Sequence, residues 1–293
     1  MAIGAFPPES LMRKKIHLWV RIAAILALAV VGAMKAKDVY RWGAGQAKDV
    51  YRWRALREIR TTLFAAIRPV RLSNCAMKRF GAPHDGGYLL CENLMSQAET
   101  AYSYGIDGRD EWGCDVSGAY HLPVHQYDCF NPKRPVCDGA QFHFHDECVG
   151  PAPVRLENRD YDSMTNHIAR NGDVGKHLLV KMDAEKAEWD AFAATPDHTF
   201  ENVDQLVVEF HDVDDRQNVG VIEKLKKTFY VANVHFNNFA CAWWSRPFPA
   251  VAFEILMVNK RLGVLDTANP WAVYPNPLDK PNEPSESDCQ TAW

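Results

Sequence analysis

Short apolar runs alternate with polar loops and helix-like segments from about Arg71 onward. Seven of the runs have the length and composition of β-strands: Ala101–Ile106, Val124–Asp128, Gln141–His145, His177–Asp183, Gln205–His211, Tyr230–Phe236 and Ala252–Val258. Helical patterns lie between some of them, at Tyr161–Ala169, Ala187–Ala194 and Val219–Thr228. This alternation predicts an α/β domain in which helices cover both faces of a mostly parallel sheet.

The N-terminal part has a different pattern. Residues Ile16–Met34 are largely apolar and would form a helix of roughly 28 Å, close to the thickness of a bilayer core. We expect a single-pass anchor, with two alternatives: a signal peptide cleaved near Val31-Gly32-Ala33, or a helix that is buried or lies on a surface. More basic residues follow the segment than precede it, which favours a cytoplasmic location for the rest of the chain, whereas the basic N-terminus also suits the opposite orientation.

Composition divides the chain into five parts. A basic segment (1–15) and the N-terminal hydrophobic helix (16–34) precede a basic, helical juxtamembrane segment (35–70) that contains AKDVYRW twice. The main domain (71–268) follows, and a tail rich in Pro, Asn and Ser (269–293) is predicted to run over its surface. The formal net charge of −4 gives no general reason to expect binding to nucleic acid.

Polar residues follow the first five predicted strands. They are Gly105 to Gly108, Asp128, Asp146, Asp183 with Glu185, and Glu209 with His211. In parallel sheets, ligands bind outside the carboxyl ends of the strands, where loops and helix N-termini meet. The pattern therefore predicts that these side chains border a common cleft.

Several motifs occur in a characteristic order. They are Asp85-Gly86-Gly87-Tyr88, AYSYGIDG at Ala101–Gly108, VKMDAEKAEWDAF, LVVEFHDV at Leu206–Val213, VHFNNFA at Val234–Ala240 and FEILMVNK at Phe253–Lys260. In this combination the chain resembles the FkbM-type and methyltransferase-like families of S-adenosylmethionine-dependent enzymes. The resemblance implies the seven-stranded, Rossmann-like class I methyltransferase fold with an antiparallel last strand. Two departures stand out. Lys186 replaces the glycine of the family pattern Asp-x-Glu-Gly-x-Glu, and the first loop reads GIDGRDEWG instead of Gly-x-Gly-x-Gly.

The resemblance also implies roles in binding S-adenosylmethionine. Asp128 stands where the family places an acceptor for the ribose hydroxyls. Gly105 and Gly108 would let the first loop pass beneath the methionine portion, and Asp146 would accept from the adenine amino group. The alternative for both acids is a solvated position in a polar loop.

Asp183, Glu209 and His211 are the predicted catalytic residues. Methyl transfer to oxygen or nitrogen requires loss of a proton from the acceptor, to a base or through a metal that lowers its pKa. These three side chains could hold Mg²⁺ or Mn²⁺, act without metal with His211 as the base, or form a purely structural network. Residues expected to line the acceptor pocket, or else to form local turns, are Asp85, Tyr88, His235, Asn237 and Asn238.

The function predicted from the sequence is methyl transfer from S-adenosylmethionine to oxygen or nitrogen of a small polar or sugar-like acceptor. One alternative, favoured by Lys186, is a non-catalytic module that binds a ligand or partner on a degenerated methyltransferase fold. Another is an exported, disulfide-bonded binding domain. The eight cysteines include no Cys-x-x-Cys pair, and we expect mostly reduced or buried thiols, with structural zinc and disulfides as alternatives.

Overall fold

The computed structural model describes residues 52–289, most of which belong to one compact unit, Leu56–Trp293. The hydrophobic segment Ile16–Met34, the first AKDVYRW copy and residues 47–51 of the second copy lie outside the described residues. Among the helices of the described part, none combines the length and the apolar character needed to cross a bilayer. The unit begins earlier than the domain boundary predicted at Arg71, because Leu63 of the first helix (residues 52–66) and Ile67, which follows that helix, are fully buried in its core.

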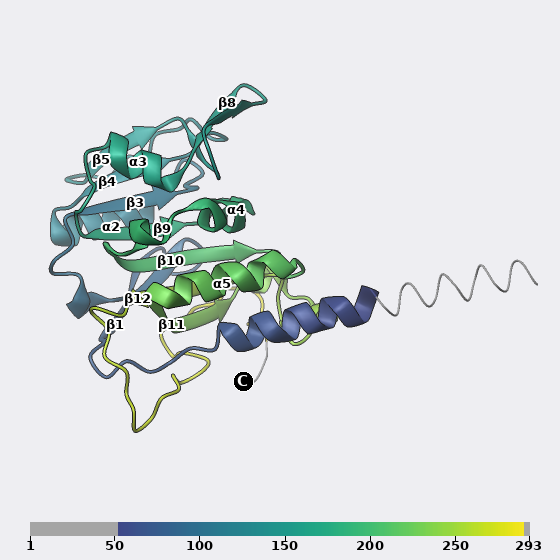
Figure 1. Cartoon of the computed structure of the whole chain (residues 1–293). Coiled ribbons are helices and arrows are strands. Elements are labelled where there is room, and N and C mark those ends of the chain that lie inside the picture. The colour runs from purple at the N-terminus through teal and green to yellow at the C-terminus, as the bar shows by residue number, and fades with distance from the viewer. Residues whose placement is uncertain (1–51, 290–293) are drawn as a thin grey trace, which may run out of the picture. The chain divides into compact units, whose positions relative to one another are not determined.

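A seven-stranded sheet forms the centre of this unit, in the order β11-β12-β10-β9-β3-β4-β5 (Figure 1). In chain order the strands are β3 (Thr100–Tyr104), β4 (Pro123–Tyr127), β5 (Gln141–His145), β9 (Leu178–Met182), β10 (Val203–His211), β11 (Phe229–Phe236) and β12 (Ala252–Asn259). The five strands from β10 to β5 pair in parallel, whereas β12 is antiparallel to both β10 and β11. The sheet is therefore mixed and not mostly parallel, because no crossover helix separates β11 from β12 and the chain must run back.

Each face of the sheet is covered. The first helix, α3 (Met164–Arg170), α4 (Ala187–Ala194) and α5 (Arg216–Thr228) contribute to the core on one face. On the other face lie α2 (Glu111–Tyr120) and a hairpin of β1 (Met77–Gly81) and β2 (Gly87–Cys91). Strand residues alternate between the two cores, so that Val207 packs in one and Val208 in the other, as expected for a strand buried on both faces.

The predicted helix Tyr161–Ala169 is partly wrong. Tyr161 lies in β8 (Arg159–Asp162), which forms a small sheet with β6 (Cys148–Val149) and β7 (Val154–Leu156). The helix α3 begins only at Met164, because the Ser163 side chain accepts a hydrogen bond from Asn166 N and caps it.

All eight cysteines are paired, which corrects the expectation of reduced thiols. The disulfides are Cys75–Cys91, Cys114–Cys137, Cys129–Cys148 and Cys241–Cys289. Each joins segments that are separated by 16 to 48 residues, and only the fold brings them together. Spacing along the sequence therefore could not reveal the pairs.

The C-terminal tail is irregular, as predicted, but it is anchored. The Cys241–Cys289 disulfide ties its end to the loop after β11. Asn282 is almost fully buried and donates to Glu254 Oε1 of β12 over 2.7 Å. The tail thus forms part of the domain surface beside β11 and β12.

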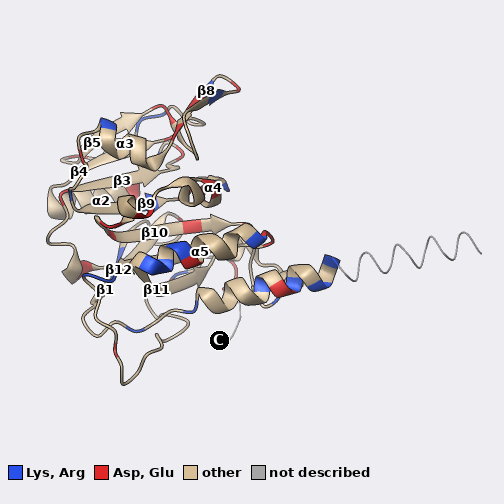
Figure 2. Cartoon of the chain, viewed as in Figure 1, with Lys and Arg blue, Asp and Glu red and all other residues tan. Residues whose placement is uncertain are grey.

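Charged residues of both signs are distributed over the domain (Figure 2). Lys and Arg lie along the first helix and along α5, and acidic residues lie on the same helices. The expectation that nucleic acid is not a partner stays a prediction.

Candidate functional site

A cleft of about 420 Å³ opens at the carboxyl ends of β3, β4 and β9. Its wall includes Gly105, Asp107, Tyr127, Asp128, Phe130, Val149, Tyr161, Asp183, Ala184, Glu185 and Ala187. Most of these residues belong to the loops that follow the three strands, and Val149 and Tyr161 come from the small sheet. A cleft of this size at this edge of the sheet can hold a small molecule.

Asp128 organises two of the loops around the cleft. Its Oδ2 accepts from the backbone N–H groups of Ile106 and Asp107, at 3.1 and 2.8 Å. Its Oδ1 accepts from the N–H groups of Phe130 and Asn131, at 2.8 and 2.9 Å. These four donors match the four lone-pair sites of a carboxylate. The expected contact with ribose hydroxyls stays a prediction, and the side chain has a structural role in addition.

Gly105 occupies a position that only glycine fits. Its φ is +68°, and a Cβ atom there would lie 1.7 Å from the carbonyl oxygen of Asp183. The loops after β3 and β9 can therefore meet at the floor of the cleft. Lys181, buried within β9, donates from Nζ to the carbonyl oxygen of Gly105 over 2.7 Å and fixes the junction.

An acid and histidine cluster lies beside the cleft. The Tyr88 hydroxyl donates to Asp183 Oδ2 over 3.1 Å, and Asn237 Nδ2 donates to Glu209 Oε1 over 2.6 Å. His211 Nε2 lies 4.0 Å from Asp183 Oδ1 and 3.8 Å from Glu209 Oε1. The structure thus brings together all three predicted catalytic residues and two of the predicted acceptor residues, Tyr88 and Asn237.

Burial and charge within the cluster raise the pKa values of His211 and Glu209. Burial opposes protonation of His211, but the hydrogen bond with Glu188 and the charges of Glu188, Glu209 and Asp183 outweigh it and raise the His211 pKa to about 9. Burial, and then repulsion from Asp183, raises the pKa of Glu209 well above its usual value. At neutral pH His211 is therefore protonated, and a carboxylate is better suited than the imidazole to accept a proton.

A divalent cation would fit a somewhat different set of residues from the one predicted. Ligand atoms of Asp183, Glu188 and His211 lie within 4.8 Å of one another. Glu188 Oε1 accepts from Ala184 N and contacts His211 Nδ1, whereas its fully buried Oε2 has no hydrogen-bond partner. The third potential ligand is thus Glu188, which the sequence prediction missed, and not Glu209.

Lys186 has a left-handed backbone conformation, which glycine adopts without strain. Its φ is +86°, and the preceding Glu185 has a φ of +50°. Both residues lie in the left-handed region, where a non-glycine residue costs roughly 1–2 kcal/mol. The turn into α4 is therefore retained despite the substitution.

Other predicted site residues lie apart from the cleft. Asp146 is exposed and does not line it, and Gly108 borders a neighbouring cavity of about 300 Å³. Asp85, His235 and Asn238 contact the C-terminal tail instead. Asp85 accepts from Asn282, Asn238 donates to the carbonyl oxygens of Glu283 and Glu286, and His235 lies between the carboxylates of Glu254 and Asp288.

Two side chains at the site, Lys181 and Glu188, were not among the predicted residues, and the sequence held a signal for each. Lys181 is a charged residue inside an otherwise apolar strand, which is rare unless the charge has a partner. Glu188 lies five residues after Asp183, in the first turn of a helix that begins at the end of a strand. Both positions could have been proposed from the placement of charge alone.

Comparison with known proteins adds no family assignment, because neither a family model nor a curated protein matches this chain.

Proposed function

We propose that this protein transfers a methyl group from S-adenosylmethionine to oxygen or nitrogen of a small polar or sugar-like acceptor. The observation that carries the proposal is the position of the cleft in a sheet of order β11-β12-β10-β9-β3-β4-β5 with β12 antiparallel. A seven-stranded sheet with an antiparallel last strand is what the motif resemblance implies for a class I methyltransferase. The cleft lies at the carboxyl ends of its central strands, where such a fold would bind the donor.

The residues around the cleft support separate places for donor and acceptor. The loops held by Asp128 and the Gly105 turn would bind the donor, which supplies an electrophilic methyl group when bound. Asp183 belongs both to the cleft wall and to the acid and histidine cluster, so a reacting methyl group near Asp183 would face that cluster. Tyr88 and Asn237 orient the carboxylates of Asp183 and Glu209 by hydrogen bonds. Acceptor proton transfer is therefore assigned to this cluster.

Glu209 is the best candidate for the general base. Its carboxylate is buried and its pKa is raised, which brings its proton affinity closer to that of an acceptor group at neutral pH. Protonated His211 nearby would hold the cluster together electrostatically. Alternatively, Asp183, Glu188 and His211 would hold Mg²⁺ or Mn²⁺, which would lower the pKa of an acceptor hydroxyl.

Lys186 no longer favours a non-catalytic module. It was the main reason to consider a degenerated fold, and its backbone keeps the positive φ that glycine would adopt. Its neighbours Asp183, Ala184, Glu185 and Ala187 line the cleft.

The four disulfides favour an oxidising compartment for the domain. They therefore support the alternative of an exported, disulfide-bonded binding domain, in contrast to the cytoplasmic side expected from the charges around Ile16–Met34. Alkylation of the protein in intact cells tests this placement: no cysteine should react before a reductant is added. Full alkylation of the eight thiols without reductant would support a cytoplasmic location of the domain instead.

Catalysis is tested with S-adenosylmethionine labelled in the methyl group, the oxidised full-length protein, and a panel of sugars, alcohols and amines. Glu209→Gln removes the proposed base and should lower transfer by about 10²–10⁴-fold. Its melting temperature should change little, because the amide oxygen still accepts from Asn237. Asp190→Asn, an exposed acid on α4, is the matched control and should keep full activity. Unchanged transfer by Glu209→Gln would contradict the assignment of Glu209 as the base.

A further inference from the structure

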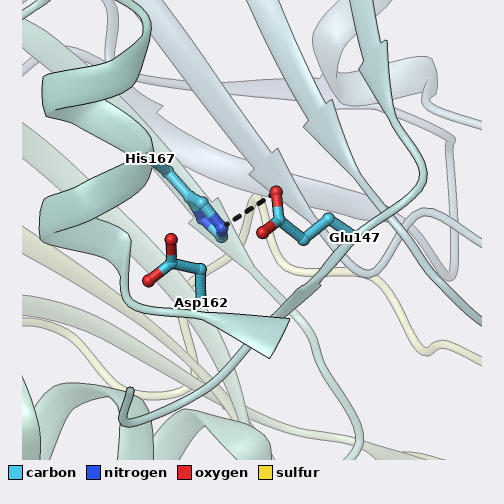
Figure 3. Close-up of side chains that lie close together, drawn as sticks. All are labelled: Glu147, Asp162 and His167. Carbon is cyan, nitrogen blue, oxygen red and sulfur yellow. Dashed lines mark ion pairs between the residues drawn. The ribbon is translucent and has the colours of Figure 1, made fainter. Parts of the chain in front are cut away.

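A second cluster of ligating side chains lies outside the acid and histidine cluster described above. It consists of Glu147, Asp162 and His167, whose ligand atoms lie within 4.8 Å of one another. Glu147 precedes β6, Asp162 ends β8 and His167 lies on α3. Figure 3 shows the imidazole directed into the space between the two carboxylates. Three different elements thus converge on one point.

The His167 ring is the unusual member of this group. It is fully buried, and neither of its ring nitrogens has a hydrogen-bond partner. The nearest carboxylate oxygen, Glu147 Oε2, is 3.6 Å from Nε2, which is beyond hydrogen-bond length. Burying an imidazole without partners costs free energy that a ligand to its nitrogen would recover. The ring is held in place by stacking on Tyr127, with centroids 4.0 Å apart.

We propose that Glu147, Asp162 and His167 form a zinc site that fixes the small sheet against the domain. One imidazole and two carboxylates are common zinc ligands, and ligand atoms around tetrahedral zinc lie about 3.4 Å apart. The observed 3.6 Å between His167 Nε2 and Glu147 Oε2 fits this spacing. Asp162 Oδ1 accepts from Ser163 N and Asn166 Nδ2, and this leaves Oδ2 for the ion.

Arg170 competes with a cation for the same carboxylates. It donates to Glu147 Oε2, and its Nη1 lies 3.6 Å from Asp162 Oδ2. Its side chain is about half exposed, at 49%, so the guanidinium can turn toward solvent when an ion enters. The arginine therefore lowers the affinity of the site without blocking it, which gives the proposal a distinctive test.

The position of the site connects it to the cleft, although the proposal does not depend on methyl transfer. Cys148, Val149 and Tyr161 line the cleft, and they adjoin Glu147 and Asp162 in the sequence. The ion would hold this wall in place from behind, in addition to the Cys129–Cys148 disulfide. The expected role is structural.

The test measures zinc bound to oxidised full-length protein after dialysis against buffered Zn²⁺, by elemental mass spectrometry. The cluster around Asp183 could also bind an ion. The measured quantity is therefore the difference in bound zinc, in equivalents per protein, between each variant and the wild type. Glu147→Gln and Asp162→Asn should each lower the affinity for one zinc ion by at least tenfold. Even residues outside the ligand shell contribute about 10–100-fold to metal affinity. Asp160→Asn, an exposed acid on β8, is the control and should bind as the wild type does.

Arg170→Gln distinguishes a metal site from a plain ion-pair network. If the cluster binds zinc, this variant should bind it more tightly than the wild type, because the competing cation is gone. Zinc should also raise its melting temperature. The proposal is overturned if wild type and Glu147→Gln hold equal amounts of zinc, or if Arg170→Gln melts at a lower temperature and gains no zinc affinity.

Discussion

Replacing Asp128 with alanine should destabilise the protein even when no ligand is bound. The carboxylate accepts four backbone N–H groups, from the loops after β3 and β4. With about 1 kcal/mol net for each hydrogen bond, the loss is about 4 kcal/mol. A domain of this size loses about 2–4 °C of melting temperature per kcal/mol, so we expect a decrease of about 8–16 °C.

Urea unfolding of oxidised Asp128→Ala, monitored by far-UV circular dichroism, measures this loss. Asp138→Ala, an exposed acid farther along the same loop, is the matched control and should change the unfolding free energy by less than about 0.5 kcal/mol. If Asp128 served only to bind the ribose, the apo protein would keep its stability and only donor affinity would fall. A loss below about 1 kcal/mol in Asp128→Ala would refute the loop-organising role.

Three further predictions concern the backbone, the tail and its disulfide. Lys186→Gly should raise the unfolding free energy by about 1 kcal/mol, because glycine adopts a φ of +86° without strain, whereas Lys186→Ala should bring no such gain. Docking of the tail should weaken as pH rises: burial raises the Asp279 pKa to about 7, and the carboxylates around buried His235 raise the pKa of that ring to about 9. Both pKa values exceed those of the unfolded chain, so the folded state loses its extra protons, and the stability they provide, as pH rises through 7 and 9. Proteolysis of the tail should therefore be faster at pH 9.5 than at pH 6, and equal rates would contradict this. Removing the Cys241–Cys289 bridge, which spans 48 residues, with a double serine variant should lower the unfolding free energy by about 4 kcal/mol at most, and an unchanged urea midpoint would show that the bridge adds nothing.

The sequence predicted the strands well because each is a short apolar run bounded by polar residues. All seven strands of the sheet were found, with ends that differ by two residues or fewer. The hairpin β1–β2 and the helix α2 were missed, because their burial depends on packing against the sheet. The apolar run Ala252–Asn259 carries no direction, so the antiparallel orientation of β12, which the structure confirms, was expected only from the motif resemblance.

The sequence predicted only part of the site, because strand ends follow a local pattern whereas contacts between distant segments do not. Strand ends placed Asp183, Glu209 and His211 together correctly, because carboxyl ends of neighbouring strands meet at one edge of a sheet. Contacts made by the C-terminal tail with Asn238 and His235 depend on how a long irregular segment folds back, and no local pattern encodes that. The same holds for the disulfides, whose partners are far apart in sequence.

Calorimetric titration of the oxidised full-length protein with S-adenosylmethionine tests the central claim most directly. We expect one equivalent to bind in the cleft, and Ala187→Trp, which places an indole in the cleft wall, to abolish the heat. Ala194→Trp, at an exposed position of the same helix, should bind the donor as the wild type does. Absence of both heat and a thermal shift at millimolar donor in the folded wild-type protein would contradict the proposed function.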